Sequence, residues 1–187
     1  MSAGLVLAAG AGTRFGAQTK QLAVLRGRPL LSYAVEAMLA VPALDRVVVV
    51  LGHAADEILR TVELGEAEGV VCREWERGQS ASLRCGVAAL RDAEAVIVTL
   101  GDQPFITPQV IAGALDELDG YDAVRAVYGG APGHPVVLGP RVLAAAGELE
   151  GDQGARDLLS RFHVRRWEAG HLCSAADVDT QEELSRL

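Results

Sequence analysis

The stretch Leu5–Lys20, LVLAAGAGTRFGAQTK, decides the first element of the fold and the loop that follows it. Its opening run, Leu5–Ala9, is short, apolar and bounded by glycine, which predicts a buried strand. Gly10 and Gly12 let the backbone approach an anion closely, because exposed N–H groups in such a turn form an anion-binding nest. The stretch ends on Lys20, the only lysine in a chain with 17 basic residues. The sequence therefore predicts a strand followed by an anion-binding turn.

Two familiar phosphate-binding motifs do not match this loop. A Walker A loop needs GxxxxGK followed by Ser or Thr, whereas Gly16 is followed by alanine. The dinucleotide fingerprint needs GxGxxG, and Gly10, Gly12 and Gly16 are spaced one residue too far apart. An ordinary strand-to-helix turn with solvated basic residues is the alternative. The lone Lys20 favours the anion site, since a compact ammonium beside a glycine loop is suited to phosphate, and Arg14 adds a second positive charge.

Strands and helices alternate along the rest of the chain. Strands are expected at residues 46–52, 69–74, 93–102 and 164–168, and helices at 29–40, 56–64, 80–91, 107–118, 151–162 and 177–187. Pro29 is expected at the first position of its helix, and Thr107 as the cap of the helix that Pro108 begins. Residues 121–139 predict two strands around a Gly/Pro turn, hence a mixed edge. Because most strands are continuously apolar, we expect an α/β fold with a mostly parallel sheet covered on both faces, in a single domain over residues 1–187.

Composition excludes several classes of protein. The net charge of −8 argues against a nucleic-acid partner, because a phosphate backbone attracts a basic surface. No apolar run reaches the roughly 18 residues that a membrane span requires, and the N-terminus lacks the basic flank of a signal peptide. Three scattered cysteines without a CxxC pair do not form a disulfide framework. We therefore expect a cytoplasmic protein, and its net charge does not argue against a nucleotide ligand, which needs only a few local charges.

Asp102 is a candidate metal ligand, and Asp179 is a candidate helix cap. Asp102 directly follows an apolar strand, and in parallel sheets ligands bind at the carboxyl ends of the strands. Mg²⁺ binds through one or two carboxylates together with phosphate oxygens and water. Asp102 could instead form a turn before Pro104. Asp179, before the last helix, could cap that helix, with Glu182 completing a capping box.

Three further segments carry polar groups that could contact a ligand. The segment GQSAS opens a helix, so Ser80 and Ser82 could bind a base or ribose, or Ser80 could simply cap the helix. His134 lies in the turn PGHPV, where a histidine is either structural or ligand-binding. Asp152, in GDQGAR, carries the same two alternatives.

Six segments taken together resemble a known family of enzymes. They are LAAGAGTRFG with Lys20, ERGQSASLRCGV from Glu76, LGDQPFI from Leu100, GHPVVL from Gly133, GDQGARDLL from Gly151 and DVDTQEEL from Asp177. Their order and spacing resemble the molybdenum cofactor cytidylyltransferase group (MobA/MocA-like) of the nucleotidyltransferases. The resemblance implies a Rossmann-like three-layer α/β/α fold. It also implies Mg²⁺-dependent transfer of a nucleoside monophosphate, CMP from CTP, to the terminal phosphate of a molybdopterin-type cofactor, with release of pyrophosphate.

The resemblance also implies roles for individual residues. Arg14, Lys20 and Asp102 would be catalytic, Asp102 and Asp179 would bind the metal, and substrate would contact Leu7, Ala8, Ala9, Gly10, Gly12, Gly78, Ser80, Ser82, His134 and Asp152. The sequence departs from the family at Gln181, where a proline is usual. A molybdenum hydroxylase is the expected transient partner. Another nucleotide such as GTP, another acceptor such as a sugar phosphate or a phosphoenolpyruvate-like acid, and a non-catalytic cofactor assembly factor stay open as alternatives.

Overall fold

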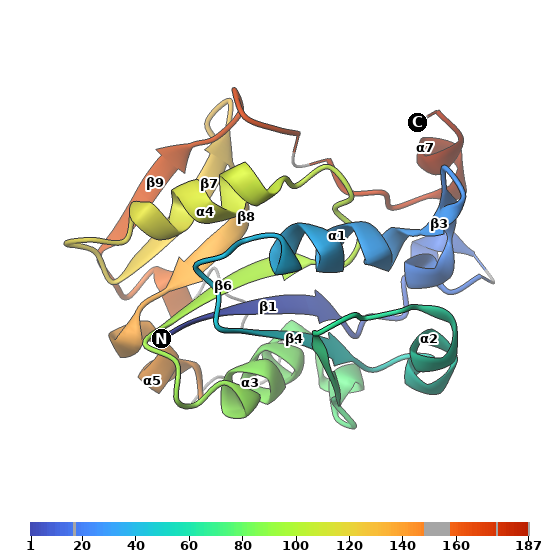
Figure 1. Ribbon diagram of the computed structural model, residues 1–187, viewed down its shortest axis with the longest axis horizontal. Helices are drawn as coiled ribbons and strands as arrows, with labels where there is room; N and C mark the ends of the chain where they lie inside the picture. The colour runs from blue at the N-terminus through green and yellow to red at the C-terminus, as the bar shows by residue number, and fades with distance from the viewer. Residues whose placement is uncertain (17, 148–157, 175, 187) are drawn as a thin grey trace.

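Seven strands form one twisted sheet at the centre of the computed structural model, which describes residues 1–16, 18–147, 158–174 and 176–186. They are β1 Ser2–Ala8, β4 Arg46–Leu51, β5 Glu68–Val71, β6 Ala95–Leu100, β7 Ala123–Tyr128, β8 Ala131–Leu138 and β9 Val164–Glu168. Their order across the sheet is β5-β4-β1-β6-β8-β7-β9 (Figure 1). Within the described part of this seven-stranded sheet, β8 is the one strand that runs antiparallel to its neighbours, β6 and β7. The expected mostly parallel, mixed-edge sheet is therefore confirmed.

Helices cover both faces of this sheet, as the continuously apolar strands require. The helices α1 Leu30–Leu39 and α4 Pro108–Asp116 lie above the sheet in Figure 1, and α3 Gln79–Ala89 and α5 Pro140–Ala146 lie below it. Val6 and Ala8 of β1 pack into the upper core, which α2 Ala55–Thr61 also joins. Ala3 and Leu5 of the same strand pack into the lower core. The sheet is therefore buried on both faces, as a three-layer α/β/α fold requires.

A third, smaller apolar cluster joins the two ends of the chain. It comprises Phe15, Ala23, Leu25, Leu30 and Val178, all buried. These residues come from the single-turn helix η1 Thr13–Phe15, the residue that follows the single-turn helix η2 Lys20–Leu22, and the short hairpin of β2 Val24–Leu25 and β3 Arg28–Pro29. The others come from α1 and the segment before α7 Gln181–Ser185. Figure 1 shows α7 beside this hairpin, on the opposite side of the molecule from β9, the strand that precedes it in the sequence. The cluster therefore holds the last segment of the chain against the glycine loop.

Most of the predicted elements are present, with local differences. The Thr107 hydroxyl caps α4 by accepting from the Val110 amide, and Pro108 begins that helix as expected. Pro29 caps α1 rather than beginning it, because it also pairs with Val24 in the short hairpin. The helix α5 and the β2–β3 hairpin were not predicted. Most of the helix expected at residues 151–162 lies outside the described residues.

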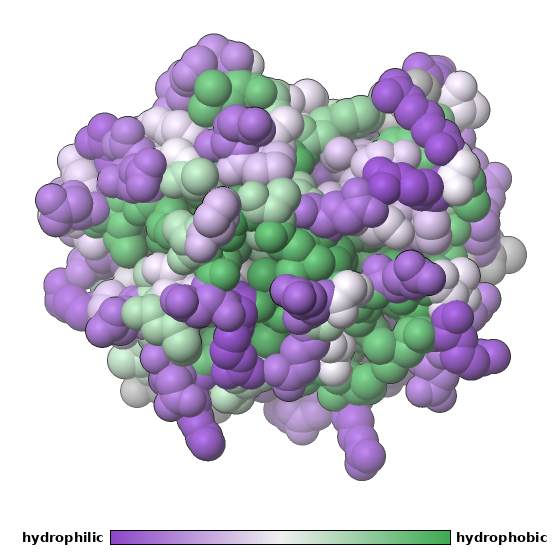
Figure 2. Space-filling view, viewed as in Figure 1, coloured by the Kyte–Doolittle hydropathy of each residue, from purple (hydrophilic) through white to green (hydrophobic). Residues whose placement is uncertain are grey.

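The viewed face of the molecule combines polar and apolar surface. Figure 2 shows hydrophilic side chains around its rim and smaller apolar areas between them. No helix within the described ranges is long and apolar enough to cross a bilayer.

Candidate active site

The glycine loop brings the backbone of residues 9–12 close to the carboxyl ends of β1 and β6. Leu7 pairs with Leu100 across the sheet, so the chain leaves both strands at the same edge. Gly12 adopts φ +58°, a left-handed conformation that favours glycine, and a Cβ there would lie 2.8 Å from the Lys20 Cβ. The glycine therefore allows the stem of Lys20 to lie directly against the loop.

Gln21 braces this loop from inside the protein. Its buried amide nitrogen Nε2 donates to the carbonyl oxygens of Ala8 at 3.0 Å and Gly10 at 2.9 Å. These two hydrogen bonds satisfy the loop carbonyls with a side chain, so the loop keeps its turn without pairing to another strand. Sequence reasoning missed Gln21, because nothing in the motif distinguishes it from an exposed glutamine.

Lys20 connects the loop to two carboxylates from distant parts of the chain. Its ammonium donates to Asp102 Oδ2 at 2.6 Å and to Asp179 Oδ1 at 2.7 Å, and its side chain is only 7% exposed. Burial opposes the charge of Lys20, but the hydrogen bonds to both carboxylates outweigh it and raise the pKa of the ammonium. Lys20 likewise lowers the pKa of Asp179. Arg14 Nη1, on a largely exposed side chain, lies 3.0 Å from Asp179 Oδ2.

Backbone contacts place the two carboxylates side by side. Asp102 lies two residues beyond the end of β6, and its carbonyl oxygen accepts from the Val178 amide at 3.1 Å. Val178 is anchored in the third apolar cluster, which positions the next residue, Asp179. The alternative in which Asp179 caps the last helix with Glu182 is wrong. Thr180 is the cap, and Glu183 completes the capping box, because Lys20 and Arg14 already hold the Asp179 carboxylate.

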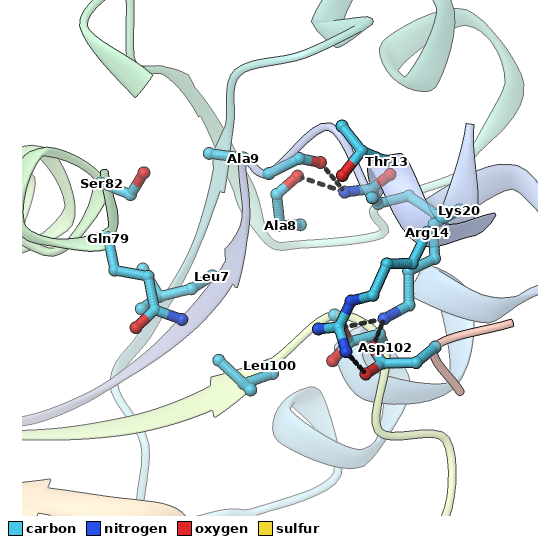
Figure 3. Close-up of a pocket in the computed structure, with 15 residues that line it drawn as sticks. Leu7, Ala8, Ala9, Thr13, Arg14, Lys20, Gln79, Ser82, Leu100 and Asp102 are labelled. Carbon is cyan, nitrogen blue, oxygen red and sulfur yellow. Dashed lines mark hydrogen bonds and ion pairs between the residues drawn. The ribbon is translucent and has the colours of Figure 1, made fainter. Parts of the chain in front are cut away.

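These groups line one cavity of about 290 Å³. Of the residues expected to contact substrate or metal, its wall includes Leu7, Ala8, Ala9, Gly10, Gly12, Arg14, Lys20, Ser82, Asp102 and Asp179. Figure 3 shows Gln79 and Ser82 of α3 on one side of the cavity, Lys20 and Asp102 on the other, and Leu7 and Leu100 between them. Gln79 and Thr13 also line the cavity and were not predicted. The structure thus brings together the anion loop, both carboxylates and the start of α3.

The remaining candidates lie elsewhere. Ser80 is fully buried and does not line the cavity. Gly78 directly precedes α3 and does not line the cavity either. His134 lines a small apolar cavity that shares Leu7, Gln79 and Leu100 with the first one. Asp152 lies outside the described residues.

The two carboxylates fit a hard divalent cation that is completed by phosphate. Asp102 Oδ1 is buried and has no hydrogen-bond partner among the described residues, so one carboxylate oxygen is available for a further ligand. No group of three or more His, Cys, Asp or Glu side chains gathers as a metal site within the described part of the chain. The donor set therefore suits an ion such as Mg²⁺, which takes one or two carboxylates and fills its shell with phosphate oxygens and water.

His134 connects the small apolar cavity to a wider polar one. The wider cavity, about 450 Å³, is lined on its polar side by Gln103, Arg125, Tyr128, His134, Ser174 and Asp177. Tyr128 donates its hydroxyl to the His134 carbonyl at 2.6 Å. Burial and the positive charge of Arg125 lower the pKa of His134 to about 4. The imidazole is therefore neutral at physiological pH.

The depressed pKa of His134 makes stability depend on pH. In the unfolded chain this histidine has an ordinary pKa of about 6.5, whereas in the folded protein it is protonated only near pH 4. Between these two pH values the unfolded state binds more protons, so the free energy of unfolding falls as the pH falls. We expect the free energy of unfolding to drop between pH 7 and 4.5 by on the order of 2 kcal/mol more in the wild type than in His134→Gln. Urea titrations of both proteins at the two pH values measure the difference. An equal drop in both would contradict the depressed pKa.

The family match, together with the fold, defines the class of protein, a nucleotidyltransferase. The sequence matches the MobA-like NTP transferase domain over residues 4–167, and the chain belongs to that family. It is 32% identical over 200 residues to nicotine blue oxidoreductase of Paenarthrobacter nicotinovorans, an alignment that covers 98% of this chain and 95% of that protein. It is 34% identical over 163 residues to the bifunctional protein GlmU of Sorangium cellulosum, which covers 82% of this chain but only 34% of GlmU.

Solved structures share this fold. The crystal structure of Rv0371c from Mycobacterium tuberculosis H37Rv superposes with a TM-score of 0.88 and 30% identity, covering 99% of this chain and 95% of that one. A second crystal structure of Rv0371c is a complex with manganese, with a TM-score of 0.84, 28% identity, and coverage of 100% and 97%. The expected family and the Rossmann-like fold are thereby confirmed.

Proposed function

We propose that this chain is a magnesium-dependent nucleotidyltransferase that moves CMP from CTP to the terminal phosphate of a molybdopterin-type cofactor and releases pyrophosphate. The observation that carries the proposal is the contact of Lys20, on the glycine loop, with Asp102 and Asp179 in one cavity. Nucleotidyl transfer requires charge neutralisation and alignment of the reacting groups, and this cavity supplies both kinds of group.

The charged side of the cavity would neutralise and orient the triphosphate of the nucleotide. The loop amides near Gly10 and Gly12, with Arg14 and Lys20, would hold the β- and γ-phosphates and stabilise the departing pyrophosphate. Asp102 and Asp179 would hold Mg²⁺, whose charge draws electron density from the phosphate oxygens. A phosphate acceptor is already largely ionised near neutral pH, since its second pKa is about 6, so the reaction needs no dedicated general base.

The start of α3 supports recognition of the nucleoside. Gln79 and Ser82 lie three residues apart on one face of α3 and line the cavity opposite the charged groups (Figure 3). Their amide and hydroxyl groups can donate to and accept from a base edge or a ribose. Gly78 would turn the chain into this helix with its φ of 101°, and Ser80 would support the wall from behind. CTP is the proposed nucleotide because of the family resemblance.

The wider polar cavity is the proposed acceptor site. It shares Leu100 with the triphosphate cavity, so an acceptor lying there would face the bound nucleotide. Arg125 contributes a positive charge to its wall, and neutral His134 lies at its junction with the apolar cavity. Asp152 would complete the acceptor site. A cytoplasmic molybdenum hydroxylase is the proposed recipient of the product.

An assay of pyrophosphate release tests this proposal. The protein is incubated with Mg²⁺ and each of CTP, GTP, ATP and UTP, with molybdopterin-type cofactor, a sugar phosphate or a phosphoenolpyruvate-like acid as acceptor. Release that requires both CTP and the pterin cofactor supports the proposal. Release with another pair reassigns the substrates, and tight cofactor binding without release indicates an assembly factor.

Oxidoreductase activity is a second candidate because of the name of one full-length relative, nicotine blue oxidoreductase. The anion-binding loop and adjoining cavity could also accept the pyrophosphate of a nicotinamide dinucleotide. Incubation with NADH or NADPH and a quinone-like dye distinguishes the two activities. Dye reduction without nucleotide-dependent pyrophosphate release would replace the transferase proposal.

Arg125→Ala tests the acceptor site separately from the nucleotide site. Losing one charge-assisted hydrogen bond, about 1.5 kcal/mol, should raise the KM for the acceptor about tenfold and leave the KM for the nucleotide unchanged. Arg141→Ala is the matched control, because Arg141 is exposed and pairs with Asp122 away from the cavity. Equal acceptor KM values in the two variants would remove Arg125 from the acceptor site.

A further inference from the structure

The charges in the triphosphate cavity are already balanced without a metal ion. Asp102 and Asp179 contribute two negative charges, and Lys20 and Arg14 contribute two positive ones that pair with them. A divalent cation approaching these carboxylates therefore meets four charged side chains whose charges cancel. Asp177 is a further carboxylate nearby, and burial and the charges of Asp102 and Asp179 raise its pKa. The protein alone offers little electrostatic attraction to such an ion.

Lys20 also occupies the carboxylates directly. Its ammonium takes one oxygen of Asp102 and one of Asp179 at 2.6 and 2.7 Å, and its side chain is almost entirely buried. A metal ion that bridged both carboxylates would have to displace this ammonium. A buried charge that loses its partners without gaining new ones is strongly unfavourable, so displacement requires another anion nearby.

The triphosphate is that anion. The stem of Lys20 packs against Gly12, in the loop whose amides face the cavity, so phosphates held by the loop would lie beside the ammonium. Arg14 is largely exposed and can turn toward phosphate with little loss of packing. Each new contact with phosphate replaces one with a carboxylate, and the carboxylate oxygens become available to the metal.

We propose that Lys20 is an internal cation that excludes divalent metal from the nucleotide-free protein, so that metal and triphosphate enter together. This inference rests on the proposed nucleotidyltransferase function and adds an order of assembly to it. It gives Lys20 a role before the reaction, in addition to its contact with the departing pyrophosphate.

Binding of Mn²⁺ to the protein without nucleotide tests the inference. Electron paramagnetic resonance reports free Mn²⁺, so its titration gives the dissociation constant independently of activity. We expect Lys20→Met to bind Mn²⁺ at least tenfold more tightly than the wild type in the absence of nucleotide. Arg14→Met removes the same charge from an exposed side chain that pairs with Asp179 alone, so it should tighten Mn²⁺ binding clearly less than Lys20→Met does.

A double variant identifies the carboxylates that bind the ion. Adding Asp102→Asn to Lys20→Met should return Mn²⁺ affinity to the wild-type value or below. A rise in melting temperature of Lys20→Met on addition of Mn²⁺ shows that the variant is folded, and Lys20→Gln replaces it if it is not. Equal Mn²⁺ affinity in nucleotide-free wild type and Lys20→Met, or a gain that survives Asp102→Asn, would overturn the inference.

The same titration separates this inference from the proposed function. With a non-hydrolysable CTP analogue, the wild type should bind Mn²⁺ at least tenfold more tightly than without it. If no nucleotide strengthens Mn²⁺ binding and no pyrophosphate is released, the transferase function fails. The comparison of nucleotide-free wild type with Lys20→Met still decides whether Lys20 excludes the ion.

Discussion

Asp102→Asn should abolish pyrophosphate release while the protein stays folded. Asparagine keeps the shape of the side chain but removes the negative charge that would hold the metal ion, and metal binding supplies several kcal/mol of transition-state stabilisation. The expected fall in kcat is at least about 10³-fold. The side chain is 26% exposed in a loop beyond β6, outside the apolar clusters, so the melting temperature should change by only a few degrees.

A coupled assay of pyrophosphate measures this loss, with thermal unfolding followed in parallel. Asp116→Asn is the matched control, because Asp116 is exposed at the end of α4 and does not line the cavity. It should turn over at the wild-type rate. If Asp102→Asn also did so, the assignment of this carboxylate to the metal would be wrong.

The sheet could be predicted from the sequence because its strands are continuously apolar and alternate with helices. The β6 run AVIVTL is buried along nearly its whole length, and this needs no knowledge of distant residues. The β2–β3 hairpin could not be predicted in the same way, because each strand has two residues and depends on the cluster around Phe15. Contacts between the ends of the chain leave no local periodicity.

The candidate site likewise has residues that local sequence predicts and residues that only distant contacts place. The loop glycines, Lys20 and Asp102 could be identified as candidate site residues from the sequence. The glycines and Lys20 follow one predicted strand and Asp102 follows another, and ligands bind at such strand ends. Ser80 and Ser82 could not be separated by composition, but they lie about 200° apart around a helix, so one faces the cavity and the other the interior. The helical phase also favours Gln79 with Ser82. Thr180 rather than Asp179 caps α7 because Lys20, 159 residues away from Asp179, engages that carboxylate.

Val178→Asp should separate the position of Asp179 from the stability of the sheet. Val178 is 1% exposed in the third apolar cluster, and an unpaired carboxylate buried there would cost several kcal/mol. We expect the final segment to detach and to carry Asp179 away from Lys20. Misplacing a catalytic group by an ångström or more lowers the rate by about 10²-fold, so kcat should fall by at least that factor.

Val24→Asp is the matched control for this variant. Val24 lies in the adjoining β2 strand but is 56% exposed, so the same new charge there is solvated and the rate should be unchanged. Thermal unfolding of Val178→Asp should remain one cooperative transition at a lower temperature, because the two large clusters on the sheet are untouched. If Val178→Asp kept the full rate, Asp179 would not be needed for turnover. If instead its kcat equalled that of Asp179→Asn, the apolar cluster would act on the reaction through Asp179, since both changes remove the same carboxylate from Lys20.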